Sequence, residues 1–141
     1  MKTIIKTAIA PKISSTGALE YCIKRDKVNR LYIQIFKNMN GKGQFSKQDI
    51  PFSSIKHLLE SKSSRSIFSK ALNSLFKTKS SNNAGFLAAI LRQEGILEED
   101  GCKHLIRLDV LAKWEAKTLA EALLELQNAS TDPKGVWGSK F

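Results

Sequence analysis

The sequence feature that most limits the fold is the stretch from residue 30 to residue 43, where side-chain character alternates before a glycine-rich turn. Because successive side chains of a strand point to opposite faces, this alternation predicts a β-strand with two unlike faces. One face is aliphatic and suits a core: Leu31, Ile33 and Ile35. The other face carries two aromatic rings around an amide: Tyr32, Gln34 and Phe36.

Similar patterns on both sides of this strand predict an antiparallel meander of three or four strands. A first strand is expected at residues 3–9 and is closed by Pro11, a second at residues 19–24, and a returning strand at residues 44–50. The connections are short and rich in residues that favour turns. The first third of the chain should therefore form a small antiparallel sheet.

Apolar residues at helical spacing predict that the rest of the chain is mainly helical. A first helix is expected to begin after an N-cap at Ser53 or Ser54. Further helices are expected at residues 65–78, 84–94 and 109–128. The acidic run at residues 98–101 is predicted to be a turn. The predicted fold class is α+β: a small N-terminal antiparallel β-meander followed by a helical C-terminal half.

Charge is distributed unevenly along the 141 residues, which carry a net charge of +10. Residues 1–80 hold 16 basic and 4 acidic side chains, whereas residues 81–141 hold 7 basic and 9 acidic ones. We interpret residues 1–80 as a basic nucleic-acid-binding region, residues 81–129 as a helical region for packing or oligomerisation, and residues 130–141 as a flexible tail. The alternative is that the lysines only keep the surface soluble.

No motif in the sequence predicts catalysis. His57 and His104 lie on separate elements, and neither stands beside a serine or cysteine in a nucleophile motif. Cys22 and Cys102 do not have the spacing of metal ligands. We therefore expect a protein that is not an enzyme, with no catalytic residue, no metal and no cofactor. No stretch reaches the ~20 apolar residues of a membrane span, so we expect a cytoplasmic protein with reduced thiols and no membrane partner.

The polar face of the central strand predicts a binding site for nucleic acid. Aromatic rings stack on bases while lysine and arginine contact phosphates, and this combination is typical of single-strand binding. The predicted site has two stacking rings and six basic side chains: Tyr32, Phe36, Lys24, Arg25, Arg30, Lys37, Lys42 and Lys47. The order of elements over residues 3–62, with its basic charge, resembles small single-strand-binding modules of the PUR type. The alternative is that the helices at residues 53–78 cover both rings.

Two other functions also fit the sequence. The helices predicted at residues 65–78 and 83–94, with a strand near residues 101–109, follow the order of a winged helix that binds duplex DNA. Its exposed recognition positions would be Ser81, Asn82, Asn83 and Arg92. The third interpretation is an adaptor or inhibitor that binds proteins through the basic half and the C-terminal helices, with Trp137 and Phe141 as aromatic anchors. The apolar stripe of those helices is also a candidate surface for a homodimer.

Overall fold

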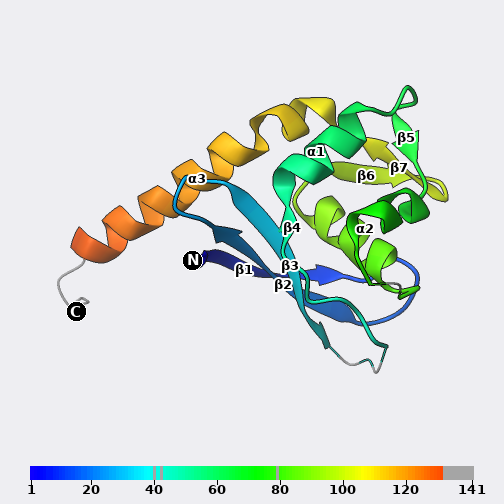
Figure 1. The fold of residues 1–141 in the computed structure, drawn as a ribbon, viewed down its shortest axis with the longest axis horizontal. Coiled ribbons are helices and arrows are strands. Elements are labelled where there is room, and N and C mark those ends of the chain that lie inside the picture. The colour runs from blue at the N-terminus through cyan, green and yellow to red at the C-terminus, as the bar shows by residue number, and fades with distance from the viewer. Residues whose placement is uncertain (40, 42, 79, 132–141) are drawn as a thin grey trace.

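The computed structural model describes residues 1–39, 41, 43–78 and 80–131. Lys42, Trp137, Phe141 and most of the predicted tail therefore lie outside the described residues. The elements follow the order β1 (Thr3–Pro11), β2 (Ala18–Arg25), β3 (Leu31–Met39), β4 (Ile50–Pro51), α1 (Phe52–Glu60), β5 (Ser66–Ile67), the 3-10 helix η1 (Ser69–Leu75), α2 (Asn83–Gln93), β6 (Leu97–Asp100), β7 (Lys103–Ile106) and α3 (Leu108–Thr131). The predicted α+β class, with its N-terminal antiparallel meander, is confirmed (Figure 1).

The first four strands form one antiparallel sheet in chain order, which we call sheet A. Its two faces differ, as the alternation in β3 predicts. The covered face is at most 2 % exposed and consists of Leu19, Tyr21, Ile23, Leu31, Ile33 and Ile35. Cross-strand pairing places the following residues on the opposite, open face: Ile4, Thr7, Ile9, Glu20, Cys22, Lys24, Tyr32, Gln34, Phe36 and Lys37.

Two register shifts in sheet A change the face of the sheet on which the following side chains lie. A shift between Ile4 and Lys6 in β1 turns Lys6 towards the covered side, where its ammonium group meets Glu94. A second shift leaves Phe36 and Lys37 together opposite Glu20, because a bulge sets two residues of one strand against one residue of its neighbour. Phe36 and Lys37 are consequently neighbours on the open face, and both are exposed.

The covered face of sheet A packs on helices α1 and α2, and the core formed there continues to the start of α3. Helix α2 lies against β1 and β2, with Leu87, Ile90 and Leu91 fully buried. Leu111 and Trp114 of α3 join the same core. Residues from both halves of the sequence thus share one hydrophobic core. This core determines which face of sheet A is covered and which face is open.

The remaining strands form a second antiparallel sheet in the order β5-β7-β6. The helix predicted at residues 65–78 is wrong in part, because Ser66 and Ile67 pair with β7 and only the 3-10 turn η1 follows them. The turn predicted at residues 98–101 is also wrong in part, because the acidic run pairs with β7 as β6 and turns only after Asp100. With α1, η1 and α2, these strands follow the order helix–strand–helix–helix–strand–strand.

Two element boundaries also differ from the prediction. Helix α1 begins at Phe52, and Pro51 at its N-cap position supplies no side-chain hydrogen bond, so neither Ser53 nor Ser54 is the cap. The burial of Phe52 in the core favours this earlier start. The returning strand predicted at residues 44–50 is reduced to the two residues of β4.

Among the helices in the described part of the chain, none has the length and apolar character to cross a bilayer.

Candidate functional site

The open face of sheet A presents one aromatic ring that is well exposed. Phe36 is 46 % exposed, and the bulge places Lys37 directly beside it. Lys47, from the segment between β3 and β4, holds its Nζ atom 5.9 Å from the centroid of the Phe36 ring. Neither lysine takes part in any ion pair among the described residues. An exposed ring with one lysine beside it and a second lysine over it, neither of them in an ion pair, can bind a planar anionic group once Lys47 moves aside.

Tyr32, the second predicted stacking ring, is half-buried and already engaged. Its hydroxyl donates to Asp26 Oδ2 over 2.9 Å, and Lys2 Nζ lies 4.4 Å from the ring centroid. Burial of Asp26 favours its neutral form, but hydrogen bonds from Arg30, Tyr32 and Val28 outweigh this effect and hold the pKa of Asp26 well below its usual range. A base that stacks on Tyr32 would have to displace Lys2.

The predicted phosphate contacts divide into paired and unpaired groups. Lys24 Nζ lies 2.9 Å from Asp49 Oδ1, and Arg30 Nε lies 2.6 Å from Asp26 Oδ2, so these two cations are neutralised by their own chain. Arg25, at the end of β2, makes no ion pair in the described part of the structure. The structure thus brings Phe36, Lys37 and Lys47 together.

Three of the four residues predicted as recognition positions of a winged helix make hydrogen bonds within the fold, whereas Ser81 is exposed. Asn83 is 1 % exposed, and its side chain accepts from the Ser46 amide and donates to the Thr78 carbonyl. Asn82 donates to the Gln44 carbonyl over 2.9 Å, and Arg92 Nε donates to His104 Nδ1 over 2.9 Å. Strands β1 and β2 of sheet A also pack against α2.

One serine–histidine contact resembles part of a catalytic triad. His104 is 2 % exposed, and its Nε2 atom lies 2.7 Å from Ser69 Oγ. The Nδ1 atom accepts a hydrogen bond from Arg92, so the ring proton resides on Nε2, which then donates to Ser69. Burial and the positive charge of Arg92 lower the pKa of His104. A neutral imidazole with this tautomer cannot accept the serine proton, so the pair is structural.

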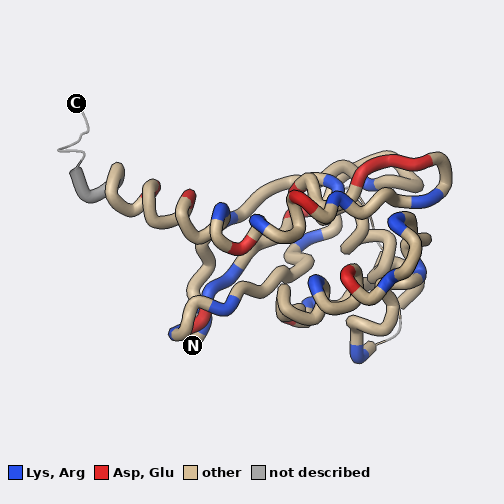
Figure 2. The backbone as a smooth tube through the Cα atoms, turned by 90° about the horizontal axis from the view of Figure 1, so that it is seen from above, with Lys and Arg blue, Asp and Glu red and all other residues tan. Residues whose placement is uncertain are grey.

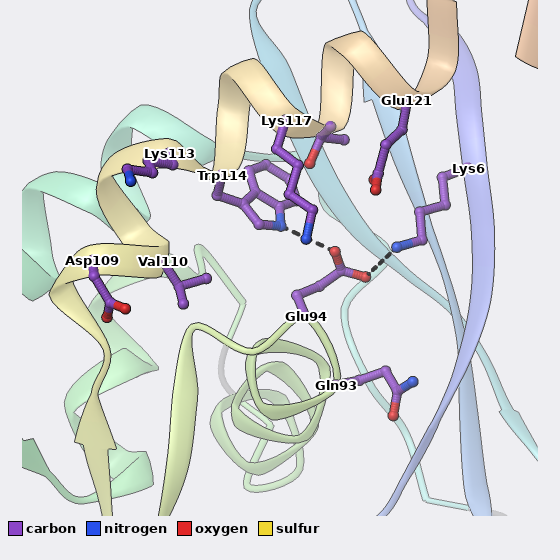
Figure 3. Close-up of a pocket in the computed structure, with 10 residues that line it drawn as sticks. Lys6, Gln93, Glu94, Asp109, Val110, Lys113, Trp114, Lys117 and Glu121 are labelled. Atoms are coloured by element: carbon purple, nitrogen blue, oxygen red, sulfur yellow. Dashed lines mark hydrogen bonds and ion pairs between the residues drawn. The ribbon is translucent and has the colours of Figure 1, made fainter. Parts of the chain in front are cut away.

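The best-connected polar cluster centres on Glu94, whose side chain is 5 % exposed at the end of α2. Its carboxylate accepts from Lys6 Nζ over 2.9 Å and from Trp114 Nε1 over 3.0 Å (Figure 3). It also accepts from the Tyr21 hydroxyl. Burial raises the pKa of Tyr21, and the hydrogen bond to Glu94 and its negative charge raise it further. The Trp114 ring also stacks on Phe52, with centroids 4.2 Å apart.

This Glu94 cluster joins β1, β2, α2 and α3 beside a pocket of about 380 Å³, whose rim includes Lys113, Lys117 and Glu121 (Figure 3). Both carboxylate oxygens already accept hydrogen bonds from the protein. The Glu94 cluster therefore anchors α3 to sheet A. This cluster was not predicted from the sequence, although a buried tyrosine hydroxyl and a buried indole N–H usually require an acceptor.

The described residues contain no cluster of three or more histidine, cysteine or acidic side chains that could hold a metal ion. Comparison of the chain with protein-family models, with curated proteins and with solved structures finds no match. The function is therefore inferred from the geometry and charge of the chain itself.

Proposed function

We propose that this protein binds single-stranded nucleic acid, without catalysing a reaction, through the open face of sheet A. The observation that carries this proposal is the exposed Phe36 ring, with Lys37 beside it and the Lys47 ammonium over the ring, 5.9 Å from its centroid. Stacking of a base on an aromatic side chain contributes about 1–3 kcal/mol, and nearby cations bind the phosphates on either side.

The proposed site is narrower than the set predicted from the sequence. Phe36 is the stacking ring, and Lys37 and Lys47 contact phosphates. Arg25 is not part of this site, because it pairs with Leu31 of the covered face. Lys42, which was also predicted to contact phosphates, lies outside the described residues. Lys24, Arg30 and Tyr32 form a secondary part of the site, because a strand that reaches them must compete with Asp49 and Asp26.

Two arguments favour a single strand over duplex DNA. A duplex keeps its bases stacked on one another, so an exposed ring on a sheet gains little from it, whereas unpaired bases are free to stack. Helix α2, which would enter the major groove in a winged helix, is covered by β1 and β2. The proposal includes a cytoplasmic location, where the free thiols of Cys22 and Cys102 stay reduced.

The test is fluorescence anisotropy with labelled single-stranded DNA, single-stranded RNA, duplex DNA and heparin, each at two salt concentrations. We expect single strands to bind more tightly than heparin, with an affinity that falls as salt rises. Equal affinity for heparin and single strands would show that the charge attracts any polyanion, and the proposal would fail. Preference for duplex DNA would also contradict it.

A further inference from the structure

We propose that a single strand bound at Phe36 continues past Lys47 into a polar pocket between α1 and η1, where Lys77 contacts its phosphates. This inference rests on the proposed function and names the path that the strand takes beyond the open face. The opposite path, along β3, is less favourable, because the cations beside it are already paired with acidic side chains of the chain itself.

The pocket has a volume of about 650 Å³ and lies between α1, η1 and the segments that precede β4 and follow η1. We call it the serine pocket, because hydroxyl groups from both helices line it. A second pocket of about 610 Å³ shares Ser74 and Phe76 with it, so the two form one continuous depression. The polar lining of the serine pocket includes Gln48, Ser53, Ser54, His57, Ser74 and Lys77.

Gln48 joins the serine pocket to the Phe36 site. Its neighbour in the chain, Lys47, holds its ammonium group over the Phe36 ring. The Gln48 side chain lines the pocket, where it donates to the Leu75 carbonyl and accepts from the Lys77 amide, each over 2.9 Å. Consecutive Cα atoms are about 3.8 Å apart, so a strand that leaves the ring reaches the pocket by crossing one short segment of backbone.

The charge of the serine pocket suits a phosphate backbone. No carboxylate is among the described residues that line this pocket or the one joined to it, whereas the pocket beside Glu94 also contains Asp109 and Glu121. Lys77 is exposed and forms no ion pair with any described residue. The acidic run at residues 98–100, red in Figure 2, belongs to the β6–β7 hairpin and lines neither pocket.

These side chains are the types that bind a nucleic-acid backbone. Lysine, serine and glutamine side chains commonly donate hydrogen bonds to phosphate and sugar oxygens, and such contacts fix the position of a strand without reading its sequence. The Phe36 ring would therefore hold a base, and the serine pocket would hold the sugar–phosphate chain that follows it.

The test is fluorescence anisotropy over a range of salt concentrations with a labelled strand of about 16 nucleotides, the upper end of the site sizes of single-strand-binding folds. Each phosphate contact adds about 0.7 to the steepness with which log affinity falls against log salt. Lys77→Ala should lower the affinity and reduce this steepness by about 0.7. Lys70→Ala is the matched control, because Lys70 is also exposed and lies on η1 but does not line the pocket.

A second measurement locates the strand directly. A photo-crosslinker on the introduced thiol of a Cys102→Ser/Ser74→Cys variant should link to the labelled strand on irradiation. The same reagent on Cys102 of the unaltered chain should not, because Cys102 is exposed on the hairpin beside the acidic run. Cys22 is buried in both proteins and does not take up the reagent. Circular dichroism checks that each variant is folded.

The outcomes separate this inference from the proposed function. If the unaltered protein does not bind the strand, the proposed function fails and this inference fails with it. If the strand binds but Lys77→Ala changes neither affinity nor salt dependence, or acts no more strongly than Lys70→Ala, only the path through the serine pocket is overturned. Cross-linking from Cys102 as efficient as that from the Ser74→Cys variant would also overturn it.

Discussion

The two faces of sheet A are built from the same strands but have opposite properties. The covered face is aliphatic, at most 2 % exposed, and closed at its edge by the Glu94 cluster. The open face holds its charges in ion pairs near Asp49 and Asp26, but leaves Phe36 and its neighbouring lysines unpaired. Stability and the proposed binding are thus assigned to opposite sides of one strand, β3.

The same contrast appears in two carboxylates that both pair with lysine. Glu94 is almost fully buried and accepts from three side chains, whereas Asp49 is 24 % exposed and bridges Lys2 and Lys24. The positive charges and hydrogen bonds of these lysines outweigh the burial of Asp49 and lower its pKa. Removal of the two carboxylates should therefore change the free energy of unfolding by different amounts, because only the loss of Glu94 leaves buried hydrogen-bond donors unpaired.

Replacing Glu94 with alanine should have the largest effect on stability. The Tyr21 hydroxyl and the Trp114 indole N–H would lose their acceptor, at about 1–3 kcal/mol each, so we expect a loss of about 2–6 kcal/mol. Asp49→Ala removes two partly exposed ion pairs, to Lys2 and Lys24, and should cost less, about 0.2–1 kcal/mol for each pair. Urea denaturation of both variants measures the difference, and similar losses for the two would refute the contrast between the carboxylates.

Truncation of neighbouring residues on β3 should separate its faces. Ile33 is fully buried on the covered face, and Ile33→Ala should reduce the free energy of unfolding by about 2–5 kcal/mol. Gln34→Ala on the open face removes a hydrogen bond to the Lys47 carbonyl, worth about 1 kcal/mol. Thermal or urea unfolding reports both values. If Ile33→Ala does not fold, Ile33→Val offers a milder change of about 0.5–1.5 kcal/mol.

The sequence predicts β3 well because its side chains alternate between the two faces of the sheet, as the pattern indicates, as far as Ile35. The bulges at Ile5 and Phe36 could not be predicted, since only pairing with β2 reveals the shift. The sequence shows the excess of basic residues, but it does not show which of them form ion pairs. Lys24 and Asp49, for example, are distant in sequence. The covering of α2 by sheet A likewise depends on long-range packing, which local periodicity does not encode.

Helix prediction failed where tertiary pairing outweighed local preference. The apolar residues at 67–76 have helical spacing, yet Ile67 pairs with His104 of β7 in the second sheet. The Glu94 cluster was missed for a related reason, since its members lie on four elements and share no motif. Their chemistry becomes visible only once the fold brings a buried tyrosine and tryptophan to one carboxylate.

Two phenylalanines provide the most direct test of the central claim that the open face binds single strands. Phe36 and Phe68 are both 46 % exposed, and a lysine ammonium lies near each ring, but only Phe36 is on sheet A. Fluorescence anisotropy with a labelled single strand should show Phe36→Ala binding weaker by about 1–3 kcal/mol, and Phe68→Ala binding like the unaltered protein. Equal effects of the two substitutions, or no effect of Phe36→Ala in a folded protein, would contradict the account.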